Sequence, residues 1–317
     1  MPNYQGVWSL STQYQNRTGW PTFVADRGLF FGGTATGGAY SATIDSVIIS
    51  STGNATDYGD LSSARNAVSG ASSATRGLVG GGYNAVDIIE YFTIAATGSA
   101  VDFGNLTEGR SNPSAASNET RALFVAGNNG GTSKDVVDYV TIASTGNATD
   151  FGNASSDKYG TSSTSSSTRL ISSGGSGYLN VIDYFTIASA GNSTDFGDLT
   201  TFPMWAASCS NGVRGVISGG TTNNPSYSVG LNTIAYVTLA TTGNAQDFGD
   251  LTLGRHGSGG TSNATRGLFA GGYPAAGYTN IIDYITIATT GNAQDFGDLT
   301  VAKRYLAACS NSHGGLQ

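Results

Sequence analysis

Near the end of the chain, three strand-length runs follow one another: RGLFAGG at residues 266–272, NIIDYITIATTG at 280–291 and NAQDFGDLT at 292–300. Versions of the last run occur six times, each built on a DFG or DYG segment. These segments begin at Asp57, Asp102, Asp150, Asp195, Asp247 and Asp295. The intervals between them are 45, 48, 45, 52 and 48 residues. Such a period is typical of a β-propeller in which each repeat forms one four-stranded blade.

Each repeat predicts four strands, which we call A, B, C and D from the centre of the ring outward. Run A is small and polar, as a crowded inner strand requires, and run B is apolar and ends in paired glycines. Run C alternates, as in IIDYITIA from Ile281, and run D carries the aromatic ring of the DFG segment. The copies of run A are expected to start at Arg65, Arg110, Lys158, Met204, Arg255 and Arg304. The TGN sequence between runs C and D predicts a hairpin turn.

The number of runs predicts how the ring closes. Six sets of B, C and D runs are present, and the last A run, at 304–311, has no B, C and D runs after it. We therefore expect this C-terminal strand to join the first B, C and D strands, which removes the free edges of an open array. The predicted fold is an all-β, six-bladed propeller over residues 23–317.

Composition excludes several classes of partner. The 14 basic and 21 acidic residues give a net charge of −7 without a Lys/Arg run, so nucleic acid is not an expected partner. The N-terminus has no signal-peptide pattern, and no run of 18 apolar residues occurs, so no membrane insertion is expected. Cys209 and Cys309 belong to different repeats, and we expect both to be free, buried thiols.

The order of these runs resembles the kelch repeat over about residues 27–312, although Phe or Tyr occupies the D-strand position where kelch repeats usually have Trp. A closer resemblance is to kelch-like virion proteins of marine bacteriophages, of the cyanophage type. It lies in TIASTGNATDFG at 141–152, RGLFAGG at 266–272, and the opening GVWSLSTQYQ at 6–15 with GWP at 19–21. The resemblance implies a structural protein located in the virion, at a tail or fibre.

The connections between runs B and C vary most among the repeats, whereas the C to D connections barely change. In a four-stranded meander the B–C and D–A connections lie on one face, so this face is the expected binding surface. Its candidate binding residues are Tyr40, Tyr83, Tyr178, Trp205, Tyr227, Tyr273 and Tyr278. Tyrosine among small polar residues suits protein or sugar recognition, but each ring could instead cover the base of its own loop. The D–A connections add Arg110, Lys158, Arg255, His256, Arg304 and Tyr305 to this face.

The first 22 residues differ from every repeat and contain Trp8 and Trp20, two of the three tryptophans. We expect this segment to attach the propeller to other virion subunits, or to pack under the propeller as a cap. The remaining partner we expect is a glycan or protein on a host surface.

Catalysis is not expected. His256 and His313 are the only histidines, so the sequence offers no His-rich metal cluster, and neither a metal nor another cofactor is predicted. The aspartates of the DFG and DYIT-type runs recur in blade after blade, which marks them as scaffold. The alternative to a virion structural role is a lectin-like module whose tyrosines stack on sugar rings. A glycan-degrading enzyme would need a clustered pair of acids that the sequence does not show.

Overall fold

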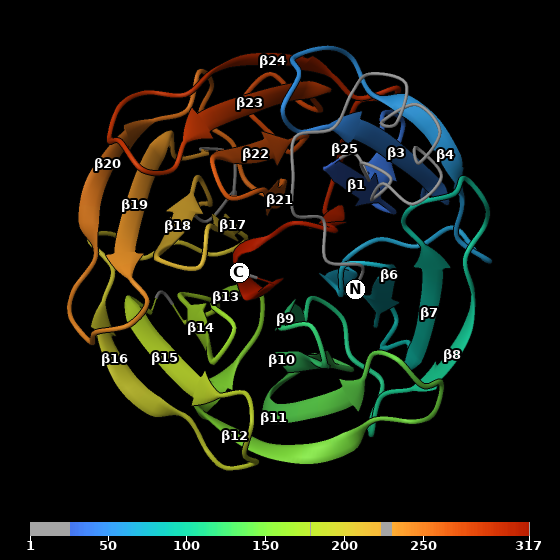
Figure 1. The fold of residues 1–317 in the computed structure, drawn as a ribbon, viewed down its shortest axis with the longest axis vertical. Helices are drawn as coiled ribbons and strands as arrows, with labels where there is room; N and C mark the ends of the chain where they lie inside the picture. Colours follow the sequence, from blue (N-terminus) through green and yellow to red (C-terminus); the bar gives the residue numbers. More distant parts are fainter. Residues whose placement is uncertain (1–25, 178, 223–229, 317) are drawn as a thin grey trace, which may run out of the picture.

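The computed structural model describes residues 26–177, 179–222 and 230–316. Six four-stranded antiparallel sheets stand around a central axis (Figure 1), which confirms the predicted six-bladed, all-β propeller. The last strand, β26, pairs with β1, so the first and last strands of the described residues share one blade, as expected. No helix in these residues is long and apolar enough to cross a membrane.

We number the blades 1 to 6 in chain order. The A strands of blades 1 to 6 are β26 (Ala307–Ser310), β5 (Ser69–Ser72), β9 (Ser114–Ser117), β13 (Ser162–Ser165), β17 (Ala207–Ser210) and β21 (Gly259–Ser262). The B strands are β1 (Arg27–Phe31), β6 (Arg76–Gly80), β10 (Arg121–Asn129), β14 (Arg169–Ser173), β18 (Arg214–Ser218) and β22 (Arg266–Ala270).

The C strands are β3 (Thr43–Ile48), β7 (Ile88–Thr93), β11 (Thr132–Thr141), β15 (Val181–Thr186), β19 (Thr233–Thr238) and β23 (Ile281–Thr286). The D strands are β4 (Thr56–Asp60), β8 (Val101–Asn105), β12 (Thr149–Lys158), β16 (Thr194–Asp198), β20 (Gln246–Asp250) and β24 (Gln294–Asp298). The described residues also form a two-residue pair, β2 (Thr34–Ala35) with β25 (Lys303–Arg304), and a short 3-10 turn, η2 (Gly314–Leu316).

The TGN sequence does not form the C to D turn, which corrects that prediction. The turn lies earlier, where for example the amide of Thr289 donates to the carbonyl of Thr286. TGN then runs along the D strand of the preceding blade: in blade 6, the amide of Gly291 donates to the carbonyl of Phe248. The DFG glycine leaves room for this contact, because a Cβ on Gly249 would lie 2.5 Å from the Gly291 carbonyl oxygen. The two most repeated motifs therefore join neighbouring blades.

The arginine that opens each B strand also links two blades. Arg169 of blade 4 stacks its guanidinium 4.3 Å from the ring centroid of Tyr184 and donates to the carbonyl of Leu239 in blade 5. The same cross-blade donation occurs from Arg27, Arg76, Arg121, Arg214 and Arg266. Six hydrophobic clusters, each shared by adjacent blades, fill the space between the sheets. The core of this fold is thus a ring of interfaces.

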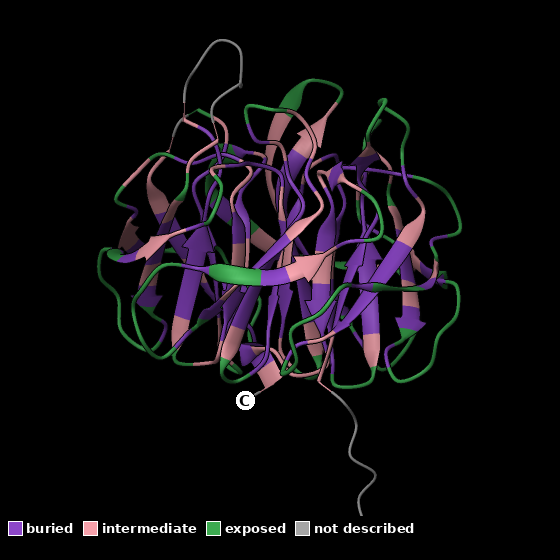
Figure 2. Cartoon of the chain, turned by 90° about the horizontal axis from the view of Figure 1, so that it is seen from above, coloured by how far each residue is buried: buried purple, intermediate pink, exposed green. Residues whose placement is uncertain are grey.

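The two faces of the disc differ (Figure 2). We call one the loop face, because it carries the B–C and D–A connections, and the other the turn face, because it carries the A–B and C–D connections. On the loop face the two kinds of connection pair with each other, as in the bridges His256 to Tyr273 and Met204 to Thr221. The C terminus lies at the turn face.

Candidate functional site

The central channel is held at the turn face by a closed ring of hydrogen bonds. Each A strand ends in a buried serine whose Oγ donates to the backbone carbonyl of the equivalent serine in the preceding blade, at 2.5–2.7 Å. The six residues are Ser72, Ser117, Ser165, Ser210, Ser262 and Ser310. All six bonds run in the same direction around the axis. The small polar residues of the A strands therefore fit the narrow channel and also link each blade to the next through these hydrogen bonds.

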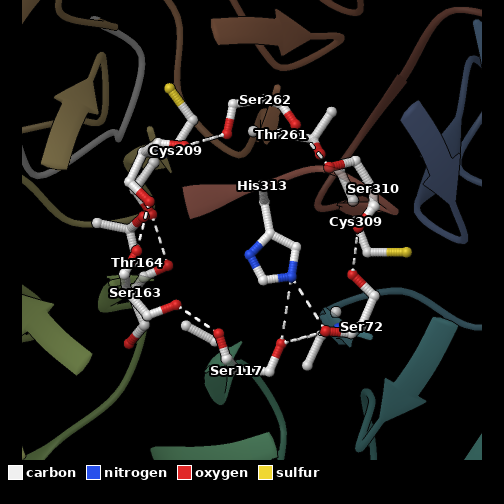
Figure 3. A pocket seen from close by; sticks show the side chains of 18 of the residues that line it. Ser72, Ser117, Ser163, Thr164, Cys209, Thr261, Ser262, Cys309, Ser310 and His313 are labelled. Carbon is white, nitrogen blue, oxygen red and sulfur yellow. Dashed lines mark hydrogen bonds between the residues drawn. The ribbon is translucent and has the colours of Figure 1, made fainter. Parts of the chain in front are cut away.

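His313 lies inside this serine ring (Figure 3). Its Nε2 is 3.0 Å from the carbonyl oxygen of Ser72, and its Nδ1 accepts a hydrogen bond from the amide of Gly315. A ring that donates from Nε2 and accepts at Nδ1 is neutral, and burial lowers the pKa of His313 to about 4. A Cβ on Gly315 would lie 1.8 Å from the Ser117 carbonyl oxygen. The C-terminal turn therefore plugs the channel, leaving a cavity of about 60 Å³.

A second closed ring surrounds the channel at the loop face. Two residues before each A strand, the chain takes a left-handed conformation with φ between 52° and 66°. The amide at each of these positions donates to the carbonyl of the equivalent residue in the preceding blade, for example Trp205 to Gly160 at 2.7 Å. The six positions are Ala67, Asn112, Gly160, Trp205, Gly257 and Tyr305. The D–A loops thus share one left-handed backbone conformation, and only the side chain at this position differs from blade to blade.

Trp205 and Tyr305 are the aromatic members of this ring. Each side chain leans over the glycine of the preceding blade: a Cβ on Gly160 would lie 2.8 Å from the Trp205 indole, and one on Gly257 would lie 2.8 Å from the Tyr305 ring. The two rings meet with centroids 5.2 Å apart. A shallow cavity of about 70 Å³ lies beneath them at the mouth of the channel. Large and small residues alternate here so that two aromatic rings cover part of the mouth.

His256, Tyr273 and Tyr278 extend this pair into an aromatic cluster across blades 5, 6 and 1. The ring of His256 stacks on Trp205 at 5.7 Å and lies 5.6 Å from Tyr273, which in turn meets Tyr278 edge-on at 5.4 Å. His256 is 1% exposed, and neither of its ring nitrogens has a hydrogen-bond partner in the described part of the chain. Burial, and then the nearby charge of Arg304, lower the pKa of His256 to about 4.

Arg304 lies over three rings of this cluster. Its guanidinium carbon is 4.2, 4.9 and 5.3 Å from the ring centroids of Tyr273, Tyr305 and Tyr278. The cluster can therefore present flat apolar faces and one cation together. We call Trp205, His256, Tyr273, Tyr278, Arg304 and Tyr305 the mouth cluster.

The sequence-predicted binding residues divide into two groups. Trp205, Tyr273 and Tyr278 come together in the mouth cluster. Tyr40 and Tyr83, from blades 1 and 2, form a separate pair with ring centroids 5.8 Å apart, and they are 42% and 50% exposed. Tyr178, Tyr227 and the two N-terminal tryptophans, Trp8 and Trp20, lie outside the described residues.

Three other residues expected on this face are buried beneath it. Arg110, Lys158 and Arg255 are fully buried and pair with the C-strand carboxylates of Asp138, Asp183 and Asp283. Arg65 pairs with Glu90 in the same way, and Lys303 with Asp45. Lys303, rather than Arg304, is thus the structural equivalent of these cations, which corrects the predicted start of the last A run.

In blade 5 both members of this ion pair are missing together. The equivalent of the cation is Pro203, one residue before the Met204 predicted from sequence, and the equivalent of the acid is Ala235. Removing both charges avoids the cost of one unpaired buried ion. The D–A loop of this blade carries Trp205 and the half-exposed Phe202. The loop that departs from the scaffold pattern is therefore also the one that supplies the largest ring of the mouth cluster.

The repeat pattern gives no indication of how Tyr305 and Arg304 join Trp205, because Trp205 and Tyr305 lie 100 residues apart in sequence and two positions apart in the loop-face ring, with Gly257 between them. In the described ranges, no three His, Cys, Asp or Glu side chains come together as a metal site would require. Cys209 and Cys309 are free and buried, as predicted.

Neither a protein-family model nor a curated protein matches this sequence.

Proposed function

We propose that this chain is a non-catalytic virion component, a propeller carried at the tail or a fibre of a phage particle with its loop face turned toward the host surface. Support for the particle comes from the repeated strings and the opening segment, which resemble kelch-like virion proteins of marine phages. Support for recognition comes from the loop face, where the aromatic residues of three blades gather around the channel mouth.

One observation carries the recognition role: Trp205 and Tyr305 hold left-handed backbone conformations, with φ of 57° and 55°. Bulky residues rarely adopt this conformation, which costs on the order of 1–3 kcal/mol per residue. The scaffold does not need aromatic rings there, because Gly160 and Gly257 make the same ring of hydrogen bonds. Strain that the fold does not require is typical of a functional surface.

The test is binding of the fluorescently labelled, purified chain to candidate host cells. We expect the double variant Trp205→Gly with Tyr305→Gly to lose binding at least tenfold, while glycine keeps the backbone geometry. Asn112→Gly is the matched control, since it makes the same change in the same ring away from the cluster. Equal binding by the double variant and the wild type would remove the mouth cluster from the proposal. Failure of antibodies to label intact particles would count against the virion location.

A second candidate function is a lectin-like module, and the mouth cluster favours it specifically. Aromatic rings with polar edges, beside an arginine, match the alternating apolar faces and hydroxyl groups of a sugar. Tyr278→Ala should then weaken glycan binding without changing the circular dichroism spectrum. Removal of surface polysaccharide from the cells should likewise abolish binding, whereas a protein receptor would leave it unchanged.

A further inference from the structure

The positive charge of Arg304 has no counter-ion within the described residues. Its guanidinium makes neither an ion pair nor a hydrogen bond there, and its buried Nε has no acceptor. The neighbouring cations differ: Lys303 is 2.9 Å from Asp45, and Arg255 is 3.1 Å from Asp283. Three tyrosine rings pack against the guanidinium group, so little side-chain freedom would be lost when an acceptor binds.

Acidic residues are distributed unevenly over the loop face. The D–A and B–C connections of blades 2, 3 and 4 include Asp87 and Glu108, and Asp157 lies near the end of β12. Those of blades 5, 6 and 1 contain no Asp or Glu at all. The described residues of these connections are 32–42, 199–206, 219–222, 230–232, 251–258, 271–280 and 299–306. The nearest acids along the chain are Asp198, Asp250 and Asp298, each at the end of an outer D strand. In a chain with net charge −7, the connections around Arg304 thus add no acidic residue of their own that would repel an anion.

The imidazole ring of His256, which lies in the same set of connections, lacks hydrogen-bond partners within the described residues. Both of its ring nitrogens are buried and unpartnered in the described residues, next to Arg304 and stacked on Trp205. Unmatched buried polar groups are rare in folded proteins and call for an explanation. The cation with free donors, the aromatic faces and the unpartnered imidazole all lie at the mouth of the channel.

We propose that the mouth cluster binds an acidic sugar, with Arg304 donating two parallel hydrogen bonds to its carboxylate or sulfate group while the sugar ring packs on the aromatic residues. The planar guanidinium fork matches both anions. This inference rests on the second candidate function, glycan recognition, and adds the chemical class of the glycan. His256 acts here as a positioning residue that supports the Trp205 ring.

The experiment compares matched pairs of probes on the full chain by calorimetry at low and physiological salt. Oligogalacturonate is set against its methyl ester, and dextran sulfate against dextran, so the two arms separate carboxylate from sulfate. We expect at least tenfold tighter binding to the acidic member of one pair. Arg304→Gln should remove this preference, and Arg304→Lys should keep part of it. Lys134→Gln, which removes one positive charge from the opposite arc of the loop face, should have no effect.

Each outcome decides a different point. Equal binding of acidic and neutral probes would overturn the role of Arg304 and leave neutral-glycan recognition standing. Acidic binding that Arg304→Gln leaves unchanged would also overturn it, since the anion would then bind elsewhere. Binding of no probe would overturn the inference and the lectin candidate together, whereas antibody labelling of particles tests the virion proposal independently.

Discussion

The ammonium group of Lys303 lies 2.9 Å from the carboxylate of Asp45, and both side chains are fully buried. The pair joins the last D–A loop to the first C strand, where the ring closes. Four other blades contain an equivalent pair, and blade 5 contains neither charge. Each blade thus has either both members of the buried ion pair or neither of them.

Removing one member of this pair should therefore be far worse than removing both. We expect Lys303→Met to cost about 3–5 kcal/mol of unfolding free energy, because it leaves Asp45 charged and buried. Lys303→Met with Asp45→Ala should cost clearly less than the sum of the two single variants, by about 2 kcal/mol or more. Urea unfolding of the four proteins in a double-mutant cycle measures this coupling. Strict additivity would mean that the pair does not act as a unit.

The serine ring should contribute measurably to stability. Ser262→Ala removes the hydroxyl that donates to the Ser210 carbonyl at 2.6 Å and leaves that buried acceptor unmatched, at a cost of about 1–3 kcal/mol. Ser172→Ala is the control. Ser172 is equally buried, but its hydroxyl has no partner among the described residues, so its loss should be neutral or slightly stabilising. Similar midpoints for the two variants in chemical denaturation would contradict the role of the ring.

The contact between the DFG segment of one blade and the TGN segment of the next can be tested with two glycines that face each other across it. Gly152 has φ of 142°, and a Cβ there would lie 2.5 Å from the Gly191 carbonyl oxygen, so Gly152→Ala should lower the thermal midpoint by several degrees. Nothing lies within 4 Å of a Cβ on Gly191, and Gly191→Ala should leave the midpoint unchanged. Equal melting temperatures for the two variants would show that this contact tolerates a side chain.

Periodicity made the architecture predictable. A repeat of about 48 residues with four strand-length runs, and one A run left over, leads directly to six blades and to closure by β26. The aspartates of the C strands were rightly interpreted as scaffold, since Asp45, Asp138, Asp183 and Asp283 all form buried ion pairs.

Contacts between blades were harder to predict, because a repeat motif does not say whether its partner lies in its own copy or in the next. TGN was interpreted as a turn for this reason, although it pairs with the preceding D strand. Arg304 follows Lys303 directly, and both are cations, so sequence alone did not show which of them is buried. His313 has no counterpart in the other repeats, and its place in the channel left no periodic signal.

The two histidines should make stability depend on pH. Each has a pKa of about 4 in the folded protein, below the value of about 6.5 for an unfolded chain, so the unfolded state binds protons first as pH falls. Stability is therefore complete above pH 6.5 and decreases toward pH 4, with a loss of about 2 kcal/mol per ring at pH 5. His313→Gln keeps a donor and an acceptor but does not titrate, and His256→Phe keeps the stacking. The double variant should lose much less unfolding free energy between pH 7.5 and pH 5 than the wild type, as measured by urea denaturation at both values. A parallel loss in both proteins would assign the pH dependence to the carboxylates instead.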